Sequence, residues 1–287
     1  MSQERIEPEC YPIHMNFLPD IFRKKAVKEL HETPEKSKEL DKLKHLLSND
    51  KTTAGIDFEE DFIRLFLRHN KYDVSKAFPY VRNFVNFRRN YSNLFINIPD
   101  EHFATKASTR FISVLPYRCP DGCTLILIEL GKWNLDEFSL EDVERMAIFT
   151  FLQTLRCPMT QINGFKSIID FKNTSIKYFR YINPSTLYLL YHVAFKCVPG
   201  RYKECHCING SVVMKFAWTV MKPFLSAKMR QRVVFHSEPE SLLNYFPTSI
   251  LPQQYGGKLN DYHNEDMMRK LNKEHRNFPI GGQPNYF

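Results

Sequence analysis

Two pairs of basic residues in the C-terminal half of the chain are spaced so that the members of each pair share a face. Arg201 and Lys203 lie two residues apart in a run that we expect to be extended, where alternate side chains point the same way. Lys228 and Arg232 lie four apart in a segment that we expect to be helical, with the same result. If the chain folds the pairs together, four cations form a patch suited to phosphate groups. The plainer alternative is that all four are ordinary solvated surface charges.

The segment between these pairs favours a helix that is apolar around most of its circumference. We predict this helix over residues 211–221, and only Lys215, Thr219 and Lys222 interrupt the apolar surface of residues 209–225. Such a helix has either two buried sides or one side against lipid. A helix that covers a hydrophobic cavity and also meets a membrane satisfies both conditions. Beside a basic patch it favours recognition of anionic lipids, and an ordinary buried core helix is the alternative.

The tripeptide Cys205-His206-Cys207 brings metal-ligating residue types together. In an extended segment both thiols point to one face, and no C-x-x-C motif lies nearby to complete a zinc site. The chain has seven scattered cysteines, and we expect reduced thiols that are mostly buried as small apolar residues. We therefore expect no metal and no cofactor.

Four other side chains are candidates for acid–base chemistry: Glu129, Asp170, His192 and His206. His206 lies in a strand-like run, where a core histidine is commoner than a catalytic one, and His192 lies within an apolar helical run. Asp170 comes at the end of an expected strand, where turn formation is the simpler role. We expect a protein without catalytic residues that is not an enzyme.

The composition favours a folded protein with an acidic partner. The 287 residues carry a formal charge of +8 and include 24 Phe and 14 Tyr against 10 Gly. The glycine motifs of nucleotide-binding proteins and hydrolases do not occur in the sequence. The aromatic residues fall in apolar periodic stripes, so we expect no nucleic-acid binding. The charge then points to an anionic membrane or an acidic protein.

Several signals bear on where the protein resides. Residues 1–11 lack the apolar core of a signal peptide, and no apolar run approaches the roughly 20 residues that a membrane-spanning helix needs. Ser2 stands where myristoylation requires glycine, and no prenylation box ends the chain. We expect a cytoplasmic monomer that associates only peripherally with membranes.

The elements that would position these residues divide the chain into two regions and a tail. Residues 1–105 show helical periodicity without a β-rich run, which predicts an α-helical bundle. Residues 106–260 alternate strand-like runs with longer helices, which predicts an α/β domain with a mixed, largely parallel sheet flanked by helices. Residues 261–287 are polar, and we expect a tail whose end, 277–287, frays.

Local signals place individual elements within these regions. Asp20 can cap the first helix, with Ile21, Val27 and Leu30 as its apolar positions. Asp73 can cap a later helix of the bundle. The expected strands are 110–115, 124–130, 164–171, 201–208 and 233–235.

Short motifs along the chain resemble, in order, those of the CRAL-TRIO family, the group of cellular retinaldehyde-binding and α-tocopherol transfer proteins. The run from Asp61 to Phe78 is similar to the family's N-terminal motif D-x-F-L-x-R-F-L-R-A-R-K-F-D. Gly131-Lys-Trp-Asn134 resembles G-K-W-D, with Asn134 in place of the acid, and Gly164–Phe171 resembles a G-x-x-x-I-x-D-x strand. The series then continues over roughly residues 20–260 with Ile208-Asn209, Lys222-Pro-Phe-Leu225, Phe246-Pro247 and Leu251-Pro-x-x-Tyr-Gly-Gly257.

This resemblance implies a helical N-terminal domain followed by an α/β domain in which a sheet floors a lipid pocket and a mobile gate helix closes it. It also implies a cleft for phosphoinositide head groups, which matches the four basic residues position by position. A further arginine of the family corresponds to Asn70 here, and Lys71 beside it is the candidate replacement. The gate corresponds to residues 211–221, with Val212, Val213, Phe216, Trp218, Val220 and Met221 as its apolar side chains.

We therefore expect an intracellular carrier that binds and transfers a small hydrophobic ligand and docks on phosphoinositide-containing membranes. The resemblance implies tocopherol- or retinoid-like cargo, and squalene-like and phospholipid cargoes also fit an apolar cavity. The alternative is a regulatory module that senses phosphoinositides and recruits a protein partner without transport. The expected pocket residues, each of which is plain core in the simpler interpretation, are Leu127, Ile128, Phe149, Leu152, Ile168, Phe171, Leu187, Leu190, Phe216 and Val220.

Overall fold

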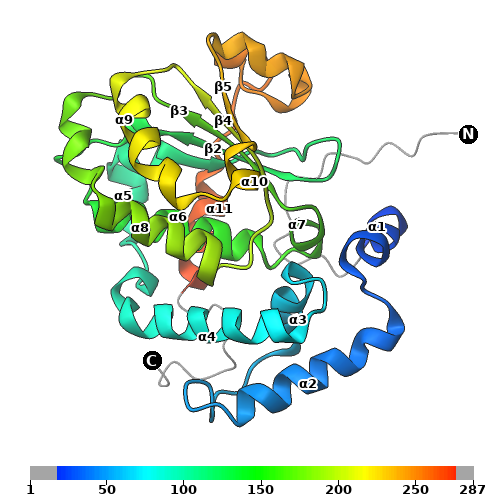
Figure 1. Cartoon of the computed structure of the whole chain (residues 1–287). Coiled ribbons are helices and arrows are strands. Elements are labelled where there is room, and N and C mark those ends of the chain that lie inside the picture. Colours follow the sequence, from blue (N-terminus) through cyan, green and yellow to red (C-terminus); the bar gives the residue numbers. More distant parts are fainter. Residues whose placement is uncertain (1–17, 276–287) are drawn as a thin grey trace, which may run out of the picture.

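Five short strands form one sheet at the centre of the molecule (Figure 1). The computed structural model describes residues 18–275. The strands lie side by side in chain order; β1 pairs antiparallel with β2, and every later pair is parallel. The predicted mixed, largely parallel sheet is thus confirmed, and each strand lies inside its predicted run. The bounds are β1 Ile112–Val114, β2 Thr124–Glu129, β3 Phe165–Asp170, β4 Tyr202–Ile208 and β5 Val233–Phe235.

The two faces of the sheet are covered differently. Three long helices lie over one face: α6 (Leu140–Thr154), α8 (Pro184–His192) and α9 (Val212–Met221) (Figure 1). Each of them lies between two parallel strands in the chain, because parallel neighbours need a crossover connection. The opposite face packs against short 3₁₀ turns within residues 239–255.

Two glycines of the sequence motifs stand where a side chain would collide with neighbouring backbone. Gly164, just before β3, has a φ of 90°, and a Cβ there would lie 2.0 Å from the carbonyl oxygen of Arg201. At Gly131 a Cβ would lie 2.0 Å from the carbonyl oxygen of Lys172. Only glycine permits these two close approaches. The first lies at the starts of β3 and β4, and the second lies between the segments that follow β2 and β3.

From residue 18 onward, five α-helices precede the sheet, and three of them, α2 to α4, lie below it in Figure 1. α4 connects them to the segment after α8, because the Tyr80 hydroxyl donates to the carbonyl of Phe195 and the Asn83 amide donates to that of Lys196 at 3.2 Å. Asp73 caps α4, as predicted, by accepting from the backbone N–H of Lys76. The bounds are α1 Asp20–Leu30, α2 Ser37–Ser48, α3 Glu60–His69, α4 Val74–Asn90 and α5 Asp100–Thr105.

The buried stripe of α1 differs from the predicted one. Ile21 and Val27 are 61% and 47% exposed. Phe22 and Ala26 are buried instead, in contact with residues in and beside α7 (Pro158–Asn163). The prediction is confirmed for Leu30, which is fully buried, and wrong for Ile21 and Val27. The helix carries two apolar stripes, and the choice between them depends on which neighbour packs there.

A helix that the sequence patterns did not predict, α11 (Glu265–His275), packs against α6. Met268 and Leu271 on its inner side are fully buried. Asn272 accepts from the backbone N–H of Ile98 at 2.9 Å and donates to its carbonyl at 2.8 Å. The first part of the expected polar tail is therefore helical, whereas the expected fraying of residues 277–287 lies outside the described residues.

We expect Leu271→Ala to lower the free energy of unfolding by about 2–4 kcal/mol, because it removes buried carbons and leaves a cavity. Lys270→Ala, on the exposed side of the same helix, is the control and should change that free energy by less than about 0.5 kcal/mol. Urea unfolding followed by circular dichroism measures both. Two small and equal effects would mean that α11 contributes nothing to the folded core.

Candidate functional site

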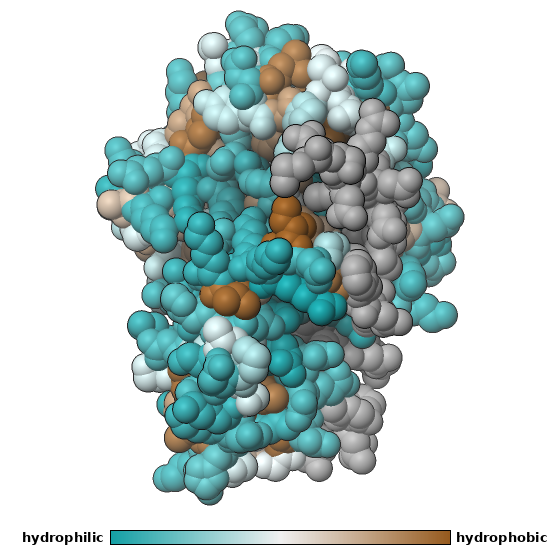
Figure 2. Space-filling view, turned by 90° about the vertical axis from the view of Figure 1, so that its right-hand side faces the viewer, coloured by the Kyte–Doolittle hydropathy of each residue, from teal (hydrophilic) through white to brown (hydrophobic). Residues whose placement is uncertain are grey.

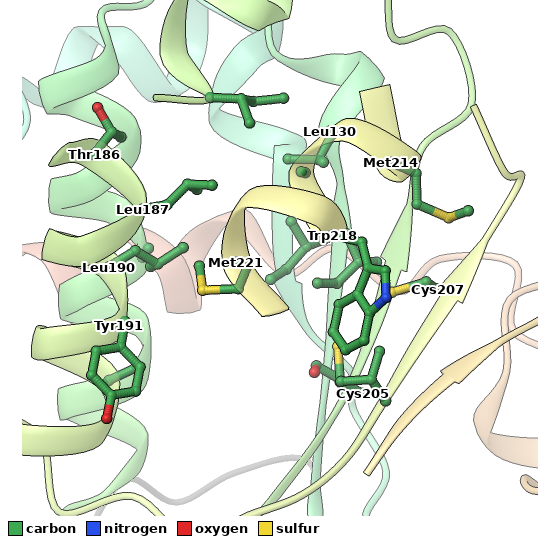
Figure 3. Close-up of a pocket in the computed structure, with 18 of the residues that line it drawn as sticks. Leu130, Thr186, Leu187, Leu190, Tyr191, Cys205, Cys207, Met214, Trp218 and Met221 are labelled. Atoms are coloured by element: carbon green, nitrogen blue, oxygen red, sulfur yellow. The ribbon is translucent and has the colours of Figure 1, made fainter. Parts of the chain in front are cut away.

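A cavity with a volume of about 460 Å³ lies between the sheet and helices α6, α8 and α9 (Figure 3). Ile128, Ile169, Cys205 and Cys207 form part of its floor, since they project from the helix-covered face of three adjacent strands. Side chains alternate between the two faces of a strand, so the residues between these point away from the cavity. The pleat of the sheet thus determines which strand side chains face the cavity.

The cavity walls are almost wholly apolar. The polar group of Tyr178 is hydrogen-bonded to the backbone. Its hydroxyl donates to the carbonyls of Leu130 at 3.0 Å and Trp133 at 2.7 Å. Such a lining suits a largely hydrocarbon molecule and offers few partners to a polar one. The helices contribute Leu140, Val143, Ala147, Ile148 and Phe151 from α6, Leu187, Leu190 and Tyr191 from α8, and Val213, Met214, Ala217, Trp218 and Met221 from α9.

Several predicted pocket residues line this cavity. They are Ile128, Phe171, Leu187 and Leu190. Ile128 comes from β2 and Phe171 from the end of β3, whereas the two leucines come from α8. Sequence patterns located these residues through apolar runs, and their contact with a bound molecule stays a prediction.

Four other predicted pocket residues do not line the cavity. Leu127 and Ile168 are fully buried on the opposite face of the sheet, one position along the strand from the residues that face the cavity. Phe149 and Leu152 are fully buried on the side of α6 away from the cavity, where the Phe149 ring lies 5.9 Å from that of His275 in α11. The prediction was wrong for all four because strands and helices buried on both sides carry no periodic signal that separates core from cavity.

Helix α9 has one apolar side toward the cavity and another toward solvent. Val213, Trp218 and Met221 face the cavity, and Figure 3 shows Trp218 and Met221 pointing into it. Val212 and Phe216, on the outer side, are 66% and 41% exposed. The sequence predicts both sides as gate surface, and the structure divides them into a side that faces the cavity and a side that faces solvent.

Two further predicted residues of this helix lie outside the cavity lining. Val220 is half-buried, and the Phe216 ring lies 4.9 Å from that of Phe179. Ser211 caps the helix by accepting from the backbone N–H of Met214 at 3.2 Å, as its position before the apolar run suggests. The predicted pocket assignment is therefore corrected for these two residues, which are not among the residues that line the cavity.

Exposed apolar side chains surround the outer side of α9. Its neighbours are α8 and the 3₁₀ helix Ile176–Tyr181. On these neighbours Ile176 is 74% exposed, Leu190 53% and Tyr188 51%. Together with the outward side of α9 they form what we call the outer apolar surface, defined as Ile176, Tyr188, Leu190, Val212 and Phe216. Leu190 belongs both to this surface and to the cavity lining.

Arg201 and Lys203 meet a carboxylate of the N-terminal region. Their side-chain nitrogens lie 3.2 Å and 3.9 Å from the carboxylate of Glu29 in α1. Burial favours a higher pKa for Glu29, but the hydrogen bond from Arg201 and the charges of Lys203 and Lys25 outweigh it and lower the pKa. Glu29 is therefore ionised at neutral pH and offsets part of the positive charge. The side of the molecule that carries α1 is mostly hydrophilic (Figure 2).

The second basic pair approaches the same end of β4. The Arg232 guanidinium donates to the carbonyl of Tyr202, and Arg232 also lines the cavity. Lys228 is exposed on α10 (Ala227–Arg230), one turn before Arg232. The structure thus gathers three of the predicted cations around the start of β4, with the fourth exposed on the adjoining helix. We call Arg201, Lys203, Lys228 and Arg232 the basic cluster.

Asn70 lies at the end of α3, where its amide donates to the carbonyl of Phe66 at 3.0 Å. The preceding His69 hydrogen-bonds with the backbone at Pro199, two residues before the basic cluster begins, and burial lowers its pKa to about 4. Lys71 is exposed and has a φ of 54°. The end of α3 therefore lies near the basic cluster, and a contribution of Lys71 to phosphate binding stays a prediction.

His206 lies on the face of the sheet opposite the cavity, where it is part of a series of hydrogen bonds that runs from Glu204 through His236 to Ser241. His206 Nδ1 lies 2.9 Å from His236 Nε2, its Nε2 lies 3.1 Å from the Glu204 carboxylate, and His236 Nδ1 lies 2.5 Å from the Ser241 hydroxyl. Burial lowers the pKa of both histidines, which are thus neutral at pH 7. His192 lies elsewhere, on α8, with its ring stacked on a tyrosine of the same helix.

The two acidic candidates are held by other partners. Asp170 accepts hydrogen bonds from the Tyr255 hydroxyl and the Asn209 amide, both at 2.7 Å. Glu129 forms an ion pair with Lys132 at 2.6 Å. Among the residues that the structure describes, none of the four acid–base candidates lines the cavity. Glu129, Asp170 and His206 instead join strands of the sheet to neighbouring segments, whereas His192 packs within α8.

Two further findings concern residues 18–275. None of their helices is long and apolar enough to cross a membrane. They contain no group of three or more His, Cys, Asp or Glu side chains placed to hold a metal ion. The Cys205-His206-Cys207 tripeptide is divided by the sheet, because its thiols face the cavity and its imidazole faces the other side.

Comparison with known proteins gives a consistent result. The family model described as the CRAL/TRIO domain matches residues 109–257, just over half of the chain. The human protein named alpha-tocopherol transfer protein-like is 27% identical over 235 residues, which cover 81% of this chain and 69% of that protein. Rat clavesin-1 is 27% identical over 248 residues, which cover 85% and 70%. The crystal structure of Sfh5 has a similar fold, with a TM-score of 0.51 and 13% identity over 81% of this chain and 90% of that chain.

Proposed function

The chain belongs to the CRAL/TRIO family, a family of lipid-binding and lipid-transfer domains, and on that basis we propose that it carries one tocopherol- or retinoid-like lipid in the cavity beneath α9. The observation that carries this proposal is an apolar cavity of about 460 Å³ covered by a helix that is apolar on both sides. A relative whose name speaks of α-tocopherol transfer supports cargo of this kind.

Enclosure of the cargo follows from the free energy of apolar burial. Each Å² of hydrocarbon surface removed from water contributes about 25 cal/mol, so a lipid of this size gains most when it is covered completely. The cavity supplies that cover from the sheet on one side and from α6, α8 and α9 on the other. A closed container of this kind needs a segment that moves to admit or release the cargo.

Helix α9 is the segment that we assign to this movement. Its inner side chains Val213 and Met221 contact the cavity, and its outer side chains Val212 and Phe216 contact solvent. At a bilayer, the outer apolar surface enters the interface, and the inner side chains exchange the cavity for lipid as the helix swings away. Opening is thereby more favourable at a membrane than in water, which is the differential interaction that such a switch requires.

The basic cluster is the proposed docking site for phosphoinositide head groups. Arg232 connects it to the cavity, because this side chain lines the cavity and also binds the backbone at the start of β4. Arg201 and Lys203 are already paired with Glu29 of α1, so a phosphate must compete with an internal carboxylate. Glu29 therefore limits head-group affinity, and a head group that displaces it loosens the contact between α1 and β4.

Two substitutions in this region should act in opposite directions. Lys228→Ala with Arg232→Ala removes two phosphate contacts worth about 1 kcal/mol each, and we expect lipid transfer to phosphoinositide-containing vesicles to slow by roughly 10- to 30-fold. Glu29→Gln removes the internal competitor, and we expect binding to the same vesicles to tighten by roughly threefold to fivefold. Vesicle co-sedimentation and a fluorescence transfer assay measure these quantities.

The control for charge alone is Lys38→Ala with Lys51→Ala, two exposed lysines of the N-terminal region. This double variant should transfer lipid at nearly the rate of the unmodified protein, and all variants should load the lipid equally. Equal slowing by both double variants, or weaker vesicle binding in Glu29→Gln, would contradict docking through the basic cluster.

Changes on the outer side of α9 should affect transfer without affecting storage. Val212→Ser with Phe216→Ser removes apolar contact with the bilayer, and we expect the transfer rate to fall by roughly tenfold. Ile96→Ser, which changes a side chain 56% exposed between α4 and α5, is the matched control. If the double variant transfers lipid at the rate of the control, α9 is not the part of the protein that enters the membrane.

A further inference from the structure

Two thiols project from the floor of the cavity. Cys205 and Cys207 lie two residues apart on β4 with their side chains on the face that lines the cavity, next to Ser167 of β3 (Figure 3). They are the thiols of a lining that is almost entirely apolar. The carrier function uses them only as small wall residues, so their chemistry is unassigned.

The surroundings of Cys205 differ from those of the other described cysteines. Hydrogen bonds from Cys207 and then Ser167 stabilise its thiolate and lower its pKa in spite of burial. Burial raises the pKa of Cys119, and it raises the pKa of Cys123 and of Cys197 to about 12. Cys205 is also the half-buried member of a set in which the other described cysteines are buried.

From the two thiols and their position in an apolar cavity, we infer that Cys205 is a covalent attachment site for lipids with an α,β-unsaturated carbonyl group. This inference rests on the proposed function, since the lipid must first enter the cavity. The Cys205 sulfur adds to the β-carbon, a C–S bond forms, and the C=C π bond breaks. Its electron pair moves through an enolate to the α-carbon, which takes up the proton lost by the thiol, so nothing is oxidised or reduced.

The geometry favours this chemistry over a role as plain wall. A hydrophobic enal partitions into the cavity and is held beside the sulfur, which raises its effective concentration there. Ser167 is the register partner of Cys205 on β3, and Cys207 lies on the same face of β4, so both polar side chains stand beside the sulfur in the cavity floor. Thiols on the opposite face, such as Cys119 and Cys123, pack among side chains of the other core and do not line this cavity. Selectivity for Cys205 therefore depends on the cavity rather than on thiol reactivity alone.

The test uses the full chain with Cys10→Ser, because Cys10 lies outside the described residues. The protein is incubated with one equivalent of trans-2-hexadecenal, reduced with borohydride and mapped by peptide mass spectrometry. We expect the adduct at Cys205 to form at least roughly tenfold faster than at Cys119, Cys123, Cys157 or Cys197. An excess of hexadecan-1-ol, which fills the cavity but has no electrophile, should slow it by a similar factor.

Two substitutions sharpen the result. Cys205→Ser should remove the cavity adduct, and Cys207→Ala should slow its formation several-fold, because the Cys205 sulfur loses a hydrogen-bond donor. Binding of hexadecan-1-ol, measured by extraction and mass spectrometry, separates the two proposals. If the alcohol binds while Cys205 reacts no faster than Cys119, the attachment site is refuted and the carrier stands. If neither lipid binds, the carrier function fails and this inference fails with it.

Discussion

The alternation of side chains along β2, β3 and β4 constrains the rest of the molecule. Each of the three strands carries apolar side chains on both faces, so both faces must be covered. Leu127 and Ile168 point to one side, where the turns of residues 239–255 fill the space completely. Ile128 and Ile169 point to the other side, where α6, α8 and α9 stand off far enough to leave a cavity. One sheet thus provides both a solid core and the floor of a container.

The cavity on one face of the sheet determines why α9 is apolar on two sides. A helix over an apolar cavity must be apolar inside, and one that opens at a bilayer must be apolar outside as well. Val213 and Val212 meet these two requirements on adjacent positions. Arg232 lies where the cavity and the basic cluster meet, and Glu29 ties that cluster to α1. Docking, opening and the position of the N-terminal helix are therefore coupled through a small number of contacts.

Much of this architecture was predictable from the sequence, for identifiable reasons. The strand bounds followed from short apolar runs between glycines and charged residues, and Gly164 proved to be a site of close backbone approach. The division of apolar residues between core and cavity was not predictable, because Leu127 and Ile128 look alike in sequence and differ only in the face they occupy. The pairing of Glu29 with Arg201 was also hidden, since it joins residues 172 apart in the chain. α11 was missed because its few buried residues stand in a polar segment.

The central claim is that the space beneath α9 holds one lipid. The most direct test is to purify the full chain natively, extract it with organic solvent and quantify the bound lipid by mass spectrometry. The account expects about one hydrophobic lipid per protein molecule, and much less in Ala217→Trp, which fills the cavity from α9. Protein that yields no lipid and takes up none from vesicles, or an equal yield from Ala217→Trp, would contradict it.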